Sequence, residues 1–352
     1  MTLLELLKIE LPIIQAPMAG VSSPALAAAV ANAGALGSIG LGATDADGAR
    51  GMFKLFAVRS ERSLNANVFC HAPARPDAAV EAAWIAYLRP YFAAFGAQPP
   101  PQLREIYRSF VADDAMLAAL LEARPRVVSF HFGVPAAERI QALRAAGIVL
   151  LASATNLAEA RVAAAAGVQG LVAQGFEAGG HRGVFDPDAP DDCLSTAVLT
   201  RLLVRELNIP VIAAGGIMDG AGIAAALRLG ASAAQLGTAF IACQESDADA
   251  GYRQALASEA AHHTVMTRAI SGRPARCLGN AFTALGAKVP APRIPSYPIA
   301  YDAGKSLNAA AKAAGDTRYG AQWAGQGAAQ SRAGLAAAAL VELLASELRA
   351  AG

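Results

Sequence analysis

The sequence predicts a (β/α)8 TIM barrel, an α/β fold in which eight parallel strands are surrounded by helices. Eight short apolar runs recur along the 352 residues, and alanine-rich helical stretches separate them. Most of these runs do not alternate with polar residues, so both faces of each strand are expected to be buried, as in a parallel sheet. Eight such units close into a barrel. An open doubly wound sheet is the alternative that the same pattern allows.

The predicted strands follow one another from the N-terminal region to about residue 240. They span residues 12–16, 36–41, 64–69, 127–132, 148–152, 170–174, 210–214 and 233–240. The stretches between them, such as SPALAAAVANAG and NLAEARVAAAAG, are good helix formers. Each of these stretches ends at a glycine, a usual residue after a helix C-terminus, which supports the alternation of strand and helix.

Two segments interrupt this alternation and predict a second, smaller domain. Residues 71–125 carry prolines and two short helical patterns, and after about Glu245 the chain contains KVPAPRIPSYPIAYDAGK, which we expect to be extended. A minimal barrel needs about 250 residues, so there is room for an extra domain. We expect the barrel to comprise 1–70 and 126–260, closed by an amphipathic helix within 330–352. The insertions 71–125 and 261–329 are expected to form a substrate-binding cap over one mouth of the barrel.

Composition and charge exclude several classes of protein. The net charge is +1 with scattered Lys and Arg, which argues against a nucleic-acid partner. The uncharged stretch 11–44 is interrupted by Pro17 and Pro24, so we do not expect a membrane span, and the charged N-terminus is unlike a secretory signal. Four cysteines without metal-ligand spacing predict reduced thiols, a cytoplasmic location and no metal site. A monomer and a homodimer both remain open.

The loop QGFEAGGHRG, residues 174–183, sets an imidazole, a carboxylate and a guanidinium among glycines. Glycine permits a positive φ and a close approach of the backbone to a ligand, as expected here of Gly179 and Gly180. Histidine is the side chain whose ordinary pKa lies nearest neutrality, so we expect His181 to be catalytic. The alternative is a solvated turn with an incidental histidine.

The loops after the seventh and eighth strands predict a phosphate site, because barrels commonly bind phosphate there. They contain AAGGIM, with Gly215 and Gly216, and QLGT, with Gly237. Without side chains, their N–H groups can point at an anion, although paired glycines also serve in ordinary tight turns. The second loop adds four candidate cofactor-binding residues, Gln235, Leu236, Gly237 and Thr238.

The bound group is not expected to be a dinucleotide, because the sequence has neither a Walker motif nor a Gly-rich fingerprint after the first strand. The first strand instead ends in QAPMAG, where Met18 and small residues suit a flat aromatic ring. Asn67 and Gln174, at the ends of the third and sixth strands, offer amides to the polar edge of a heterocycle. The alternative for each amide is a buried group satisfied by the main chain.

These residues belong to stretches that run in order through nearly the whole chain and resemble class I nitronate monooxygenases, formerly called 2-nitropropane dioxygenases. The matching stretches are PIIQAPMAGVSSPALAAAVANAGALGSIG, NANVFCH, VVSFHFG, QGFEAGGHRGVF, PVIAAGGIMDG, GASAAQLGTAF, YPIAYDAGK and QWAGQG.

The resemblance implies FMN on a TIM barrel, O2 as oxidant, and alkyl nitronates, notably propionate 3-nitronate, as substrate. It places His181 beside the flavin, and the FMN against residues that include Met18, Asn67, Gln174, Gly179, Gly216 and the 235–238 turn. Some relatives in the wider superfamily are NAD(P)H-dependent reductases of quinones or enoyl thioesters that share the EAGGHRG loop. Such a reductase is the alternative function, and a non-catalytic flavin-binding protein is a third.

The substrate side of the site is predicted from Tyr297, Tyr301 and Lys305, which are spaced four residues apart. In an extended or irregular segment they would converge only by wrapping a pocket. Two phenols and an ammonium suit a carboxylate or a nitronate, whereas a solvated lysine with surface tyrosines is the alternative. His131, at the end of the fourth strand, is expected at the same mouth, and Tyr107 resembles a family tyrosine that reaches the substrate. His71, His262 and His263 are left outside the site.

Overall fold

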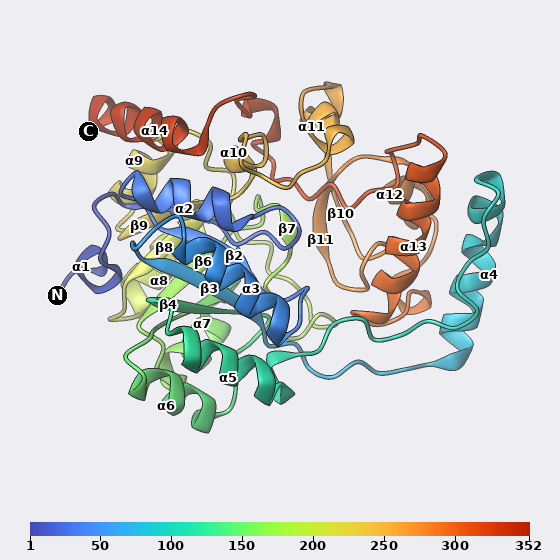
Figure 1. Ribbon diagram of the computed structural model, residues 1–352, viewed down its shortest axis with the longest axis horizontal. Coiled ribbons are helices and arrows are strands. Elements are labelled where there is room, and N and C mark those ends of the chain that lie inside the picture. The colour runs from blue at the N-terminus through green and yellow to red at the C-terminus, as the bar shows by residue number, and fades with distance from the viewer.

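The computed structural model describes residues 1–352 and confirms the barrel (Figure 1). Its eight parallel strands are β1 (Ile13–Gln15), β2 (Gly37–Gly40), β3 (Leu64–Phe69), β4 (Val127–His131), β5 (Val149–Ala154), β6 (Gly170–Gln174), β8 (Val211–Ala214) and β9 (Ala233–Leu236). Their order in the sheet is β1-β9-β8-β6-β5-β4-β3-β2. The two end strands also meet, because Leu36 N donates to Ile13 O at 3.0 Å and Gln15 N donates to Leu36 O at 2.9 Å. The sheet therefore curls round on itself, which excludes the open doubly wound alternative.

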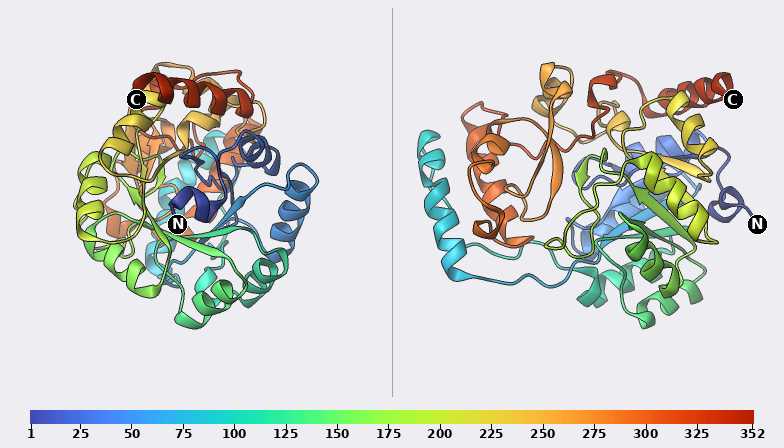
Figure 2. Two further views of the ribbon diagram at one scale, coloured as in Figure 1. Left: turned by 90° about the vertical axis from the view of Figure 1, so that its left-hand side faces the viewer. Right: turned by 180° about the vertical axis from the view of Figure 1, so that it is seen from behind.

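Eight helices surround the strands and bury their outer faces. They are α2 (Pro24–Asn32), α3 (Ala46–Ala57), α5 (Asp114–Ala123), α6 (Ala137–Ala145), α7 (Leu157–Ala166), α8 (Thr196–Glu206), α9 (Gly220–Arg228) and α14 (Ala337–Ala351). The predicted closing helix is α14, which packs against α2 and α9 and so completes the ring (Figure 2, left). At the barrel end away from the cap, α1 (Leu3–Leu7) buries Leu3 and Leu7 among strand residues.

Local sequence signals explain where the helices of the barrel begin and end. Ser23 accepts a hydrogen bond from Leu26 N at the start of α2, where Pro24 occupies the first turn. Asn156 caps α7 in the same way, and Gly167 ends that helix with φ +93°. Ser23 and Asn156 begin the helices that follow β1 and β5, so these two caps lie in strand-to-helix turns at the mouth of the barrel.

The cap is built from both insertions, which lie at one end of the molecule (Figure 1). The outermost helix α4 (Ala78–Ala94) packs Trp84 and Leu88 in one apolar core with Phe282 of α12 (Ala281–Gly286) and Leu307 of α13 (Ile299–Ala313). A second sheet has the order β10 (Thr264–Thr267), β11 (Ala275–Leu278), β7 (Gly180–His181). The short elements are η1 (Phe110–Ala112), α10 (Thr238–Ile241), α11 (Ala250–Leu256), η2 (Glu259–His262), η3 (Ala291–Arg293) and η4 (Ala328–Gln330).

Two segments differ from those predicted, and we propose to move one domain boundary. The eighth strand ends at Leu236, and the following apolar residues form α10, because an apolar run alone does not distinguish a strand from a buried helix. Helix α5 packs Met116 and Leu120 into the barrel core, so we propose that the first insertion ends before α5 rather than at residue 125. The segment expected to be extended becomes helical at Ile299, directly after its last proline, Pro298.

No helix is both long and apolar enough to cross a membrane.

Candidate active site

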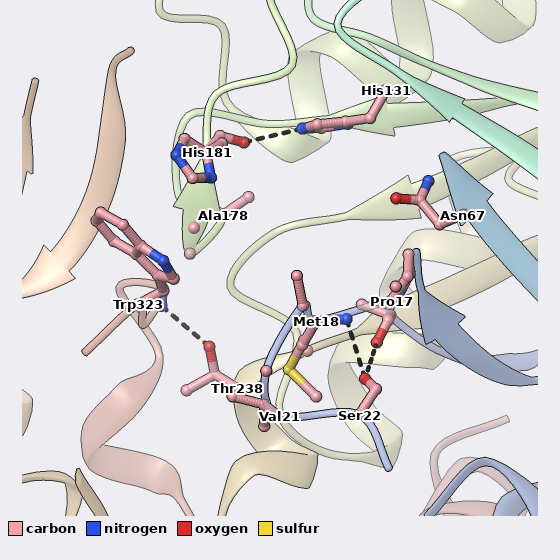
Figure 3. A pocket seen from close by; sticks show the side chains of 18 of the residues that line it. Pro17, Met18, Val21, Ser22, Asn67, His131, Ala178, His181, Thr238 and Trp323 are labelled. Atoms are coloured by element: carbon pink, nitrogen blue, oxygen red, sulfur yellow. Dashed lines mark hydrogen bonds between the residues drawn. The ribbon is translucent and has the colours of Figure 1, made fainter. Parts of the chain in front are cut away.

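A cavity of about 480 Å³ lies at the mouth of the barrel, between the ends of the strands and the cap. Figure 3 shows its interior, with Met18 and Thr238 on one side of the space and His181 and Trp323 beside the cap. The cavity brings together nearly all the predicted site residues. Those that line it are Met18, Asn67, Tyr107, His131, Gln174, Gly179, Gly180, His181, Gly215, Gly216, Gln235, Gly237, Thr238, Tyr297, Tyr301 and Lys305.

Leu236 is the predicted cofactor-binding residue that the structure does not bring into the cavity. Its side chain is buried among apolar residues of α2, α9 and α14. Successive side chains of a strand point to opposite faces, so Gln235 faces the cavity and Leu236 faces the helices. The side chain of Leu236 therefore points away from the cavity, and binding of the cofactor by this residue of the 235–238 turn stays a prediction.

The turn after β1 forms a wall made largely of main chain. Gln15 is fully buried and holds this turn: its Nε2 donates to Ser22 Oγ at 2.8 Å, and its Oε1 accepts from Ser38 N at 2.8 Å. Ser22 Oγ in turn accepts from Met18 N at 2.9 Å. This network presents small residues and the thioether of Met18 to the cavity, which suits the face of a planar ring.

The predicted phosphate turn also consists of main chain. Gly215 has φ +129° and Gly216 has φ +71°, conformations that residues with a Cβ rarely adopt. A Cβ built on Gly216 would lie 3.2 Å from Glu177 Cβ. Lys305 is the only lysine or arginine that lines the cavity, and it belongs to the cap. An anion at this turn would therefore be held by N–H groups rather than by a cationic side chain.

His181 lies where the barrel meets the cap. Its main chain pairs with Ala275 of β11, and its carbonyl oxygen accepts from His131 Nε2 at 3.1 Å (Figure 3). The same oxygen accepts from Gln174 Nε2 at 3.0 Å. Because a carbonyl oxygen only accepts, the proton of neutral His131 is on Nε2, and its Nδ1 accepts from Ser153 Oγ at 3.0 Å.

Gln174 also fixes the loop of His181, since its Oε1 accepts from Gly183 N at 2.7 Å. Each end of this amide thus has a main-chain partner, as the alternative interpretation of the residue anticipated. Pairing of Gln174 with a heterocycle stays a prediction. Arg182 also stabilises this loop, because its Nε and Nη2 donate to the two carboxylate oxygens of Asp191 at 2.7 and 2.9 Å.

The two histidines of the site are neutral at physiological pH. Burial, together with the neighbouring His131 and Arg273, lowers the pKa of His181 to about 3. Burial likewise lowers the pKa of His131 to about 4. A neutral imidazole can both donate and accept a hydrogen bond, so it can donate to an anion or take a proton.

The cap wall carries the predicted substrate-binding residues. Tyr301 and Lys305 lie one helical turn apart on α13, so a helix brings them together, and the expectation of an extended segment was wrong. Lys305 Nζ donates to Tyr107 OH at 2.6 Å and lies 5.0 Å from the centre of that ring. Burial raises the pKa of Tyr297 and of Tyr301, so both phenols keep their protons as donors. No carboxylate pairs with Lys305, which leaves its charge for a ligand.

Comparison with known proteins assigns the family. The model of the nitronate monooxygenase family matches residues 1–347. The chain belongs to the nitronate monooxygenase family. It is 63% identical to a nitronate monooxygenase of Paraburkholderia phytofirmans over 99% of this chain and 94% of that one. It is 52% identical to one of Pseudomonas aeruginosa over 98% of each chain. The protein is therefore an enzyme, an oxidoreductase, and nitronate oxidation is the activity that these relatives support.

A solved structure supports both the fold and the family. The nitroalkane oxidase of Streptomyces ansochromogenes is 42% identical, with a TM-score of 0.89 over 99% of this chain and 98% of that one. The whole chain, including both insertions of the cap, therefore has a counterpart in that enzyme.

Two residues near the site of this family member were missed in the sequence. The ring centre of Trp323 lies 5.1 Å from that of His181, and its motif QWAGQG was noted only for its resemblance. His71 was left outside, yet it is buried, its ring centre is 4.9 Å from that of Tyr297, and neither ring nitrogen has a hydrogen-bond partner. His262 and His263 are exposed. No group of three or more His, Cys, Asp or Glu side chains is arranged to hold a metal ion.

Proposed function

We propose that this enzyme oxidises alkyl nitronates, notably propionate 3-nitronate, with FMN as cofactor and O2 as oxidant, giving a carbonyl compound and nitrite or nitrate. The observation that carries the proposal is the asymmetry of the cavity, which joins a main-chain wall to a wall with one cation, phenols and a neutral imidazole. We also propose a cytoplasmic location, which is supported by four free cysteines.

The residues present fit FMN. Gly215 and Gly216 leave main-chain N–H groups accessible to a phosphate, and the turn that carries Met18 suits the ring. Asn67 Nδ2 donates to Ser129 O and Oγ, both at 3.0 Å, which leaves its Oδ1 to accept from a ring N–H. When bound, FMN supplies the acceptor for the electrons that the nitronate loses.

The side chains of the cap would bind and orient the substrate. Propionate 3-nitronate carries two negative groups, and the cavity offers it the ammonium of Lys305, the hydroxyl group of Tyr301 and the imidazole of His181. Tyr297 also lines the cavity, with its hydroxyl buried and without a partner in the protein. We place the carboxylate at Lys305, which is exposed at the mouth beside Tyr107. The nitronate group would then lie deeper, beside His181.

The low pKa of His181 favours a substrate that is already deprotonated. An imidazole whose pKa is about 3 is a weak base for a carbon-bound proton. A nitronate needs no such step, and its negative charge would raise the pKa of a neighbouring imidazole and strengthen the hydrogen bond between them. Neutral nitroalkanes are therefore expected to be poorer substrates.

The proposal is tested on one preparation of purified protein. The cofactor released by denaturation is identified by mass, and oxygen uptake is measured with propionate 3-nitronate and, separately, with NADH. We expect FMN, rapid uptake with the nitronate, and no bleaching of the flavin by NADH without oxygen. Release of FAD would contradict the proposed cofactor, and bleaching of the flavin by NADH without oxygen would favour the reductase alternative.

A further inference from the structure

The ring of His181 has a single hydrogen-bond partner in the protein, the hydroxyl of Ser271. Ser271 Oγ lies 2.9 Å from His181 Nε2. It belongs to the segment between β10 and β11 of the cap, 90 residues away in sequence, and is 1% exposed. The other ring nitrogen, Nδ1, has no protein partner, although His181 lines the cavity. Ser271 therefore fixes which nitrogen is left for a ligand.

The hydroxyl of Ser271 has two acceptors for its one proton. It can donate to Arg273 O, 3.3 Å away, or to His181 Nε2, while Arg273 N donates to its oxygen at 3.4 Å. When it donates to Arg273 O, its oxygen accepts from the Nε2–H of His181, and Nδ1 carries a lone pair. When it donates to His181 Nε2, the imidazole proton is on Nδ1. The two orientations of the hydroxyl thus correspond to the two neutral tautomers of His181.

We propose that Ser271 is a positioning residue that directs His181 Nδ1 at the substrate and, by rotating its hydroxyl, lets the same imidazole donate or accept a hydrogen bond there. This inference rests on the proposed role of His181 in nitronate oxidation. Nδ1–H donates to a nitronate oxygen in one tautomer. In the other, Nδ1 takes the proton of a neutral nitroalkane as the C–H bond breaks and its electron pair stays on the substrate. The resulting imidazolium then donates from Nε2 to Ser271 Oγ.

The groups around His181 make its hydrogen bond with Ser271 important for the protonated form of the imidazole. The titratable and charged groups that face the ring are His131 of β4, His71 after β3, Arg273, Tyr297 just before α13 and Tyr301 in α13. The Arg273 guanidinium carbon lies 4.2 Å from the ring centre of Phe132, which packs 5.7 Å from that of His181. None of these groups is a carboxylate. Ser271 Oγ is the acceptor within hydrogen-bond distance of the ring, so it is the group that can stabilise the charged form.

The test is NMR of the holoenzyme labelled with ¹⁵N-histidine. The chain has five histidines, so the spectrum is simple, and His181→Asn identifies the signals of His181. At neutral pH we expect intermediate ¹⁵N shifts, the average of two tautomers. In Ser271→Ala we expect a single tautomer with the proton on Nδ1, because the buried Nε2 has lost its acceptor. Ser271→Thr keeps the hydroxyl and is expected to keep the averaged shifts.

Activity gives a second measurement on the same variants. Ser271→Ala is expected to lower kcat/KM for neutral nitroethane by about tenfold, since a hydrogen bond to the charged ring is lost, and for propionate 3-nitronate by much less. Ser60→Ala is the matched control: this buried hydroxyl contacts Asn32 Oδ1 at 2.7 Å, far from the cavity, so its loss reports only stability.

Two results would overturn the inference. One is that the shifts of His181 are the same in Ser271→Ala as in the parent, and the other is that Ser271→Ala and Ser60→Ala lose equal activity on both substrates. If Ser271→Ala does not fold, two other variants replace it. Ser271→Thr is expected to show the averaged shifts of the two tautomers, and Ser271→Cys, whose thiol is a weak donor, is expected not to show them. The NMR measurement needs no turnover, so it still reads the Ser271–His181 contact if the parent oxidises no nitronate.

Discussion

The barrel wall and the cap wall of the cavity differ in what they present to a ligand. The barrel contributes main-chain turns around Met18, Gly216 and Gly237, held from behind by buried groups such as Gln15. The cap contributes side chains with chemistry of their own, including Tyr301 and Lys305. A main-chain site recognises a feature common to many ligands, a phosphate or a flat ring, whereas a side-chain site selects one substrate. We therefore propose that cofactor and substrate specificity are determined by separate parts of the chain.

His181 belongs to both walls. Its strand β7 is part of the cap sheet, but its carbonyl oxygen is held by His131 and Gln174 of the barrel. A substitution at His181 is therefore expected to affect both walls, whereas a substitution elsewhere in one wall is expected to affect that wall alone and to have a smaller effect.

His181→Asn is expected to have the largest effect. If the imidazole takes a proton from neutral nitroalkanes, kcat/KM on nitroethane falls by about 10²–10⁴-fold, while preformed nitronates lose less and FMN stays bound. Steady-state oxygen uptake and the flavin spectrum measure the two effects. The exposed His262→Asn serves as the control. If His181→Asn oxidises both substrates at the parent rate, His181 has no part in the mechanism. If the variant loses FMN, the loop of His181 instead serves to bind the cofactor.

Asp191→Ala tests how firmly the His181 loop is held. It leaves the guanidinium of Arg182, whose side chain is 2% exposed, without its carboxylate, and we expect a loss of about 3 kcal/mol in the free energy of unfolding. The control Asp188→Ala removes an ion pair with Arg268 whose carboxylate is exposed, and about 0.5 kcal/mol is expected. Equal losses in urea unfolding would mean that the buried pair has no special role.

The effect of Asp191 is expected to depend on pH. Burial alone raises the pKa of this carboxyl, but hydrogen bonds from Arg182 and from Cys193 N outweigh it and hold the pKa below the ordinary value. A lowered pKa in the folded state means that the stabilisation is complete at neutral pH and is lost as the pH falls through the folded-state pKa. The stability difference between the parent and Asp191→Ala is therefore expected to narrow in acid. A difference that is constant from neutral to acid pH would contradict this account.

Gly216→Val tests the barrel wall alone. A β-branched residue at φ +71°, with its Cβ 3.2 Å from Glu177 Cβ, strains the turn by roughly 1–2 kcal/mol and obstructs the approach of the phosphate. Weaker FMN retention is expected, measured by flavin release on dilution. Gly147→Val is a matched control, because Gly147 has φ +79° with nothing near its Cβ. If both variants retain FMN equally well, the turn does not bind the phosphate.

Lys305→Met tests the cap wall and is expected to have the smallest effect. It keeps the stem and removes the charge, and a partly exposed ion pair contributes about 1 kcal/mol, or roughly fivefold in KM for propionate 3-nitronate. Ethyl nitronate, which has no carboxylate, is expected to be little affected. Lys312→Met on the same helix removes a charge that pairs with Asp249 outside the cavity and is the control. Equal losses for both nitronates would mean that Lys305 contacts the nitronate group or is structural.

The sequence predicted the barrel and most of the residues that line the cavity, because both depend on local patterns. Apolar runs and glycine turns are read within about ten residues, and their order fixes which turns meet at the mouth. The prolines before residue 299 led to the wrong expectation that Tyr301 and Lys305 lie in extended chain, because they interrupt only the residues that precede α13. The four-residue spacing of Tyr301 and Lys305 was itself a helical signal. Strand alternation could have shown that the side chain of Leu236 faces the helices rather than the cavity.

Other parts of the site have no local signal. Trp323, His71 and Ser271 reach His181 or its neighbours only through packing of the cap, and Ser271 is 90 residues distant from its partner. The short strand β7 was also missed, because a two-residue strand has no periodicity and exists only through its partner β11. Such contacts between distant segments require the three-dimensional structure.

The main-chain character of the proposed phosphate turn has a consequence for ionic strength. No lysine or arginine lines that end of the cavity, so a phosphate there would be held by peptide dipoles and short hydrogen bonds rather than by full charges. Dissolved ions screen the attraction between exposed full charges over about 8 Å at 0.15 M salt. Lys305, exposed at the mouth, would act on the proposed substrate through such an attraction. Added salt is thus expected to weaken capture of the substrate while leaving the hold on the cofactor nearly unchanged.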